Sequence, residues 1–298
     1  MGRDQNGVLA AIKRVHDSIS SDERFRTRFR QEVEAISRVQ SEFVPKVFAS
    51  DLEDERPWLA TEFIDGPSLS EVITSGRTLS AKTIIKIAID VAQAIKALHA
   101  ERVIHRDIKP GNILLTPNGA RVIDMGIAQV GATRSIDQSS RTSIIGSPGF
   151  MSPEQATGKE GELTSSTDIF SWASTVSAVI TGNSPFGEGN ALAIAARVMT
   201  QDPELPDLEE VEGLSEQDRT LLRSTILPYL KRAWSKNFDE TQGDYTRPSA
   251  AKLVEHISEK LFEFDSTVIE DLQFSDAEIE YIFDEPKLVY EAKSKVLS

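Results

Sequence analysis

A short stretch between two apolar runs, residues 103–115, carries polar side chains whose types suggest a specific chemistry. Asp107 can accept a proton, Lys109 can hold a phosphate through its ammonium group, and Asn112 can supply an oxygen to a metal ion. Asp124 follows twelve residues after Asn112 and ends a short apolar segment. Two oxygen ligands, a base and an ammonium group suit metal-assisted phosphoryl transfer, because Mg²⁺ prefers oxygen donors.

Three motifs, in this order along the chain, resemble the motif set of the protein kinase superfamily. His105-Arg106-Asp107, followed by Asn112, resembles the catalytic loop. Asp124-Met125-Gly126 resembles the magnesium-binding Asp-Phe-Gly, and Ser152-Pro153-Glu154 resembles the Ala-Pro-Glu that closes the activation segment. Lys109-Pro110 is similar to Ser/Thr rather than Tyr kinases. The run Lys-Pro-Gly-Asn is most similar to the eukaryotic-type kinases of bacteria.

The resemblance implies an α+β, bilobal protein kinase fold. We expect a small, β-rich N-lobe over residues 1–63, truncated to the family's third to fifth strands and one helix. A mainly helical C-lobe would follow over residues 64–262, and an acidic tail over residues 263–298, for which a solvated role is favoured over a regulatory one.

The same resemblance implies ATP and Mg²⁺ as cofactors and transfer of the γ-phosphoryl group to Ser or Thr hydroxyls of proteins. Asp107 would accept or orient the hydroxyl proton, and Lys109 would steady the γ-phosphate. Asn112 and Asp124 would bind Mg²⁺. A homodimer for autophosphorylation is a further expectation.

Two elements near the N-terminus would position the phosphates. Residues 8–15 predict a strand, in which Ala11-Ile12-Lys13 resembles the family's Ala-Ile-Lys, so Lys13 would hold the α and β phosphates. The next segment predicts a helix from about Ser21, with apolar residues at helical spacing. At about 100° per residue, Glu32 falls near the middle of this apolar stripe.

A carboxylate that is turned toward a core needs a cationic partner, and Lys13 is the expected partner of Glu32. The alternative is that Glu32 stays hydrated at the edge of the apolar stripe.

The nucleotide base would be held by a hinge between the lobes. Residues 43–48 and 58–64 predict two further strands. By resemblance, Glu62-Phe63-Ile64 is the hinge, in which backbone groups of Glu62 and Ile64 hydrogen-bond adenine, and Thr61 is the gatekeeper. A long amphipathic helix is predicted to begin at Ser80 and to lead to the catalytic loop.

The activation segment, residues 124–154, is rich in hydroxyl groups. The resemblance implies phosphorylation, favoured at residues 139–143, with Arg106 placed to pair with the phosphate. Ser147 stands where the family has a Thr that contacts the catalytic residues. The alternative is a polar loop without this role.

Two later residues have structural roles by resemblance. Residues 164–182 predict a mostly apolar helix that carries one charge, Asp168, which would accept hydrogen bonds from the backbone of the catalytic loop. Arg247 would pair with Glu154. Residues 208–244 are more charged than the family pattern leads us to expect, and the sequence assigns them no role.

Composition excludes several classes. With 298 residues, 39% of them hydrophobic, the chain can bury a large core. The absence of cysteine excludes disulfides, Cys-ligated zinc and thiol nucleophiles. The net charge of −14 argues against nucleic acid as a partner. Without a membrane-length apolar run or a signal pattern, we expect a cytoplasmic chain.

The front of the sequence departs from the family. Only residues 1–7 precede the Lys13 strand, and no G-x-G-x-x-G lies upstream of it. Because residues 2–7 resemble the turn between the family's second and third strands, we expect a truncated start. The alternative is a genuinely lidless protein, completed by a partner strand.

A missing lid also supports a second functional reading, a catalytically silent kinase-like binding module. The presence of every expected catalytic and nucleotide-binding side chain argues against it: Lys13, Glu32, Asp107, Asn112 and Asp124.

Overall fold

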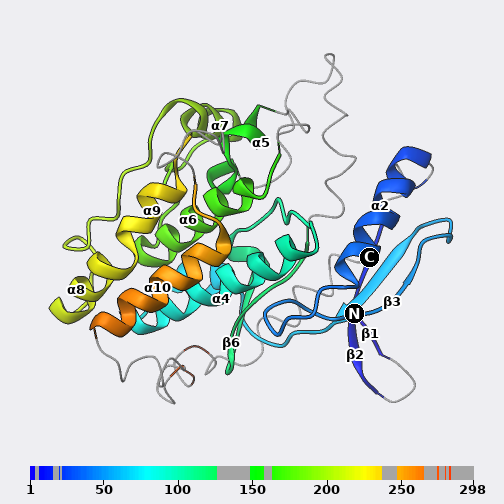
Figure 1. Cartoon of the computed structure of the whole chain (residues 1–298), viewed down its shortest axis with the longest axis horizontal. Helices are drawn as coiled ribbons and strands as arrows, with labels where there is room; N and C mark the ends of the chain where they lie inside the picture. Colours follow the sequence, from blue (N-terminus) through cyan, green and yellow to red (C-terminus); the bar gives the residue numbers. More distant parts are fainter. Residues whose placement is uncertain are drawn as a thin grey trace.

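The computed structural model describes residues 1–3, 7–15, 20, 22–125, 148–157, 163–236 and 247–264, together with Phe274, Ile279 and Ile282. Two lobes are evident in Figure 1: a small sheet with helix α2, and a larger helical lobe that contains α4 to α10. The predicted bilobal α+β architecture is confirmed. None of the helices in these described ranges is both long and apolar enough to cross a bilayer.

The small lobe is built on a four-stranded antiparallel sheet with the order β1-β2-β4-β3. Its strands are β1 (Gly2–Arg3), β2 (Leu9–Arg14), β3 (Val47–Asp51) and β4 (Trp58–Glu62). β1 pairs with the start of β2, as expected for residues that flank a hairpin turn. Lys13 on β2 lies opposite Leu59 on β4.

The strand predicted over residues 43–48 is misplaced, since β3 begins only at Val47. Pro45 cannot donate a hydrogen bond to a sheet ladder. The carbonyl of Phe43 instead accepts from the N–H of Val122 at 2.9 Å, so this segment joins the small lobe to the large one.

Helix α2 (Glu23–Ile36) lies beside the sheet (Figure 1). The side chain of Asp22 caps it by accepting hydrogen bonds from the N–H groups of Arg24 and Phe25, because the first amides of a helix have no partner within it. The predicted apolar stripe is confirmed, and its buried members are Phe25, Phe29, Val33 and Ile36.

The large lobe is organised around α4 (Ala81–Ala100) and α6 (Ser166–Thr181), which pack against each other. Ser80 caps α4, and Gly182 ends α6 in the left-handed conformation that glycine adopts without strain. Trp172 is fully buried and donates its indole N–H to the carbonyl of Ala88 at 2.9 Å. Both predicted helices are therefore confirmed.

The remaining elements surround this pair. They are α3 (Leu69–Thr74), η1 (Pro110–Asn112), β5 (Ile113–Thr116), β6 (Gly119–Val122), η4 (Pro148–Phe150), α5 (Pro153–Ala156), α7 (Ala191–Thr200), α8 (Glu216–Thr225), α9 (Leu227–Ala233) and α10 (Ala250–Phe264). The segment without an assigned role, 208–244, supplies α8 and α9, which bury Leu222 and Leu230 in the core. Within these two helices the charged residues Glu216, Arg223 and Lys231 lie on the exposed face.

Part of the predicted acidic tail packs on the large lobe. Phe274 and Ile282 are only 4% and 5% exposed. The ring of Phe274 lies 6.0 Å from the Lys86 ammonium group of α4. At these two positions the expectation of a solvated tail is wrong, because apolar side chains anchor it.

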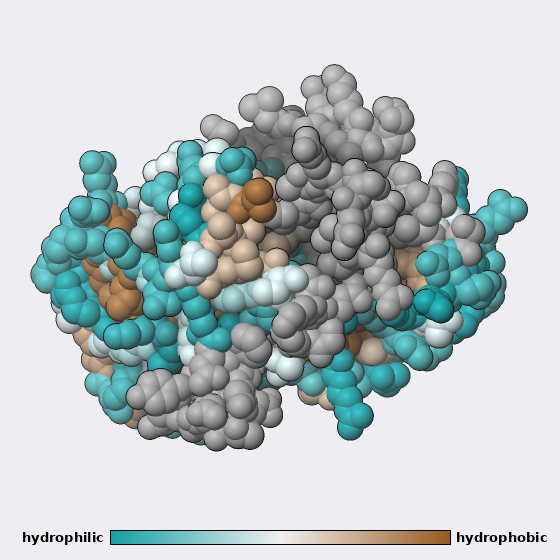
Figure 2. Space-filling model, turned by 90° about the horizontal axis from the view of Figure 1, so that it is seen from above, coloured by the Kyte–Doolittle hydropathy of each residue, from teal (hydrophilic) through white to brown (hydrophobic). Residues whose placement is uncertain are grey.

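On the face seen in Figure 2, the surface of the described residues is mostly hydrophilic, with an apolar patch over α7. Leu192 and Met199, which lie seven residues apart on one side of this helix, are 58% and 38% exposed. Arg197, the one charged residue of α7, turns away and donates to the carbonyls of Phe186 and Glu188.

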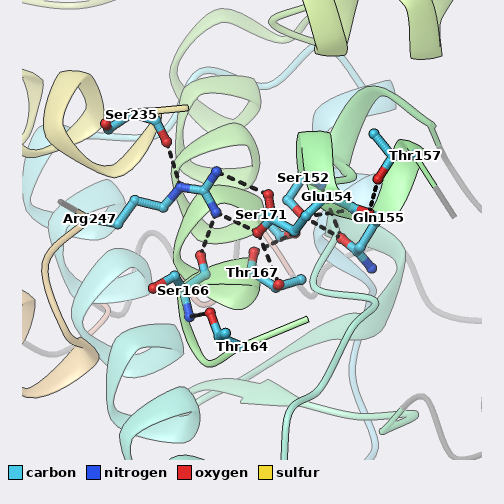
Figure 3. Close-up of polar contacts among 10 residues, drawn as sticks. All are labelled: Ser152, Glu154, Gln155, Thr157, Thr164, Ser166, Thr167, Ser171, Ser235 and Arg247. Atoms are coloured by element: carbon cyan, nitrogen blue, oxygen red, sulfur yellow. Dashed lines mark hydrogen bonds and ion pairs between the residues drawn. The ribbon is translucent and has the colours of Figure 1, made fainter. Parts of the chain in front are cut away.

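A buried ion pair ties the end of the large lobe to α5, as the resemblance predicts (Figure 3). Arg247 donates to both carboxylate oxygens of Glu154, at 2.6 and 3.2 Å, and both side chains are essentially inaccessible to solvent. Arg247 also donates to the carbonyls of Ser235 and Ser166, and Thr167 donates to Glu154. Burial raises the pKa of Glu154. The hydrogen bond and the charge of Arg247 lower it, and together the lowering effects outweigh burial, so the net pKa lies below its ordinary value.

Removal of the Arg247 guanidinium should therefore be costly. We expect Arg247→Met to lower the free energy of unfolding by about 3–5 kcal/mol, since Glu154 is left as an uncompensated buried charge. Urea unfolding measures the change. The double variant Arg247→Met/Glu154→Gln should recover part of the loss, and equal instability of the single and double variants would contradict this explanation.

Candidate active site

One carboxylate, that of Asp168, holds the backbone of the catalytic loop. Asp168, in the first turn of α6, accepts hydrogen bonds from the N–H groups of His105 and Arg106, at 2.9 and 2.8 Å. His99, in the last turn of α4, approaches the same carboxylate with its Nε2 at 2.8 Å. Burial raises the pKa of Asp168. The hydrogen bond and charge of His99 lower it, as do the charge and backbone N–H of His105, and these effects outweigh burial. The net pKa lies below the ordinary value, so the carboxylate is ionised. The predicted role of Asp168 is confirmed.

Sequence reasoning missed His99. Its signal was a single histidine in the last turn of a predicted apolar helix, where the helix dipole favours a positive charge. That signal does not name Asp168 as the partner.

His105 links the loop to the strand that leads to Asp124. Its Nδ1 accepts from the N–H of Asp107 at 3.2 Å, and its Nε2 lies 3.0 Å from the carbonyl of Ile123. A proton on Nε2 therefore satisfies both contacts. The side chain is fully buried, and burial lowers its pKa, which keeps the ring neutral.

The three predicted catalytic side chains meet at one point. Lys109 Nζ lies 2.8 Å from Asp107 Oδ2. Asn112 donates its amide N–H groups to the carbonyl and to Oδ2 of Asp107, both at 2.8 Å. Because the amide nitrogen of Asn112 is thereby engaged, its Oδ1 is the atom that remains for a metal ion.

Asp124 follows Ile123, whose N–H donates to the carbonyl of Asn112 at 2.8 Å. Its φ of 57° is left-handed, which is uncommon for a residue other than glycine and is typical of functional sites. Its carboxylate is 57% exposed and lies 3.7 Å from Lys13 Nζ on β2. The structure thus brings Lys13 together with a predicted metal ligand.

The predicted pair between Lys13 and Glu32 is not present. Both residues lie in the described part of the chain, but Glu32 pairs with Arg106 instead, Nη1 to Oε1 at 2.8 Å, while Lys13 pairs with Asp124. The inward orientation of Glu32 and its need for a cation were predicted correctly; the cation was not. The guanidinium of Arg106 reaches it from a loop that Asp168 holds in place.

At the predicted hinge, the side chain of Glu62 makes a bridge to the large lobe. Glu62 accepts two hydrogen bonds of 2.8 Å from Arg121 on β6, and Arg121 also donates to the carbonyl of Val44. This bridge lowers the pKa of Glu62. Ile64 is buried. A hollow of about 580 Å³ lies beside the hinge, on residues 7–9 and 62–63 among others, but no catalytic-loop residue lines it. The adenine contacts of Glu62 and Ile64 stay predictions.

Gly126, residues 139–143 and Ser147 lie outside the described residues, so the activation-segment hypotheses rest on the sequence alone.

The environment of Glu32 should make stability depend on pH. Burial raises the pKa of Glu32 from 4.5 to about 7, although Arg106 opposes the shift. Between these values the folded protein holds a proton that the unfolded chain has lost, so stability falls as pH rises. Gln at position 32 cannot titrate. We therefore expect Glu32→Gln to gain stability relative to wild type as pH rises from about 5 to about 8.

Urea unfolding at these two pH values tests this expectation. Glu34→Gln, on the exposed face of the same helix, is the matched control. Parallel pH profiles for wild type and Glu32→Gln would show that Arg106 fully compensates the burial.

Comparisons with known proteins agree with this geometry. The protein kinase domain family matches residues 2–258. The serine/threonine-protein kinase AfsK of Streptomyces griseus is 35% identical over 76% of this chain. The probable serine/threonine-protein kinase PkwA of Thermomonospora curvata is 32% identical over 85% of it. The chain spans only 27% and 34% of the lengths of these two relatives.

Among solved structures, the PknI kinase domain of Mycobacterium tuberculosis is similar, with a TM-score of 0.59 over 84% of each chain. At 21% identity this likeness supports the fold alone. The family match covers most of the sequence, including every predicted site residue. The chain therefore belongs to the protein kinase domain family.

Proposed function

We propose that this chain transfers the γ-phosphoryl group of ATP to Ser or Thr hydroxyls of proteins. The observation that carries the proposal is the convergence of Asp107, Lys109 and Asn112 on one point, with Asp124 and Lys13 paired beside them. The relatives named as serine/threonine-protein kinases support the choice of acceptor. They give no support to a catalytically silent binding module.

Each side chain has a role in this proposal. The hydroxyl oxygen of the substrate attacks the γ-phosphorus, ADP leaves, and Asp107 orients the hydroxyl and takes its proton. Lys109, held against Asp107, faces the transferred phosphoryl group with its positive charge. Lys13 positions the α and β phosphates. Glu62 and Ile64 hold adenine through their backbone groups.

The oxygen atoms of Asp124 and Asn112 fit a divalent cation, and we propose Mg²⁺. Mg²⁺ in phosphoryl-transfer sites takes one or two carboxylates and completes its shell with phosphate oxygens and water. The exposed carboxylate of Asp124 and the Oδ1 of Asn112 meet this requirement. Bound there, the ion would neutralise charge on the β and γ phosphates. The cytoplasmic location and the homodimer expected from the sequence stay predictions.

Removal of the proposed base tests the reaction. Asp107→Asn is nearly isosteric but cannot accept the proton, so transfer of radiolabelled phosphate to a generic protein substrate should fall at least about 10²-fold. Nucleotide binding should be retained, because Asp107 does not hold ATP in this scheme. Asp202→Asn, at an exposed position after α7, is the control. Near wild-type transfer by Asp107→Asn would remove Asp107 from its role.

Removal of the proposed metal ligand tests the cation. Asp124→Asn replaces a charged oxygen donor with a neutral one, so the Mg²⁺ concentration for half-maximal activity should rise at least about 10-fold, since even indirect partners of a metal contribute that much. Titration of fluorescent-nucleotide binding with Mg²⁺ should show the same shift. An unchanged Mg²⁺ requirement in both measurements would place the metal elsewhere.

A further inference from the structure

Gln155, the third residue of α5, uses both ends of its side-chain amide. Its Oε1 accepts hydrogen bonds from the N–H and the hydroxyl of Ser152, at 3.0 and 3.3 Å, and closes the capping box of α5 (Figure 3). Its Nε2 donates to the carbonyl of Arg106 at 2.6 Å. Because the bond from the Ser152 N–H requires an acceptor, the orientation of the amide is fixed, and the donor end faces the catalytic loop.

The carbonyl that Gln155 holds belongs to a constrained peptide. Arg106 has a φ of 66°, a left-handed value that costs a non-glycine residue free energy and persists only where the surroundings hold it. The N–H of Arg106 is bound by Asp168, and the next N–H, that of Asp107, is bound by His105 Nδ1. The peptide unit between Arg106 and Asp107 is thus held at its nitrogen by His105 and at its oxygen by Gln155.

This peptide carries the proposed base. A rotation of the unit would tilt the Cα–Cβ bond of Asp107 and move its carboxylate away from Lys109 and Asn112. Asp168 fixes the loop on the amide side of Arg106, and Gln155 fixes it on the carbonyl side.

We propose that Gln155 is a positioning residue for Asp107. The side-chain amide of Gln155 holds the carbonyl of Arg106, and this contact fixes the orientation of Asp107. The proposal rests on the proposed function, in which Asp107 takes the proton. The support is rigid, because the neighbouring Glu154 anchors α5 to Arg247 through the buried ion pair (Figure 3). A cap alone would not require glutamine: Glu closes the same box, whereas only the amide offers a donor to Arg106.

Gln155→Glu separates the two roles. The carboxylate keeps the acceptor for Ser152 but has no donor, and it places an oxygen against the Arg106 carbonyl. At about pH 8 we expect the kcat of phosphoryl transfer to fall about 10- to 100-fold, the effect of a catalytic group displaced by about 1 Å, with little change in the KM for ATP. Protonation of the introduced carboxyl restores an O–H donor. The ratio of variant to wild-type kcat should therefore rise as pH is lowered toward the ordinary carboxyl pKa, to about 5.

Ser152→Ala is the matched control, because it removes the capping hydroxyl and leaves the bond from Gln155 to Arg106 intact. It should lower the melting temperature without a change in kcat. A role of Gln155 in capping alone would instead make the two variants behave alike and would give no recovery at low pH.

Hydrogen exchange gives a readout that does not depend on activity. The amides of residues 105–107 should exchange faster in Gln155→Glu than in wild type, and also in Gln155→Met, which serves if the charged variant unfolds. Unchanged exchange, or a kcat within about twofold of wild type, would overturn the positioning role. An inactive wild type would instead contradict the proposed function, and the exchange data would still decide the role of Gln155.

Discussion

One buried carboxylate sets the geometry on which the candidate active site depends. Asp168 is fully buried, and an ionised group in such a place is tolerated only when donors satisfy it. Two consecutive backbone amides, of His105 and Arg106, and the ring of His99 do so. This convergence holds Arg106 in its left-handed conformation, and that conformation determines where Asp107 projects. Hydrogen bonds to a charged group contribute about 1.5–3 kcal/mol each, enough to maintain such strain.

Two ion pairs, one in the core of the large lobe and one between the lobes, differ in strength. The Arg247–Glu154 pair is inaccessible to solvent, so a break there leaves a bare charge in the core. The Lys13–Asp124 pair is 41% and 57% exposed, and pairs of that kind contribute about 0–1 kcal/mol. The core of the large lobe is therefore fixed by a buried pair, whereas Lys13 reaches Asp124 through a weak, hydrated contact.

The range over which each interaction acts explains how much of the protein could be predicted from its sequence. Hydrophobic periodicity and capping residues located α2 and α4, and a mostly apolar run located α6, because burial and unsatisfied helix ends act locally. Motif spacing located Asp107 and Asn112, and the resemblance gave a role to Asp168, the one charge of an apolar helix. The strand predicted over residues 43–48 begins later than expected, because Pro45 cannot donate a hydrogen bond to a neighbouring strand. Gln155 and His99 escaped notice because their partners are distant in sequence and no periodicity encodes them.

Glu32 pairs with Arg106 instead of the predicted Lys13, and the reason is again physical. Periodicity showed that Glu32 turns inward, and desolvation then requires a cation, but neither states which cation. Arg106 is a planar donor with a backbone fixed by Asp168, so it loses little conformational freedom when it pairs. Lys13 sits on a strand with an exposed ammonium group and a second carboxylate, Asp124, within reach. Since partly exposed pairs differ by only about 1 kcal/mol, the choice between them rests on a roughly fivefold population ratio, too small for any sequence pattern to encode.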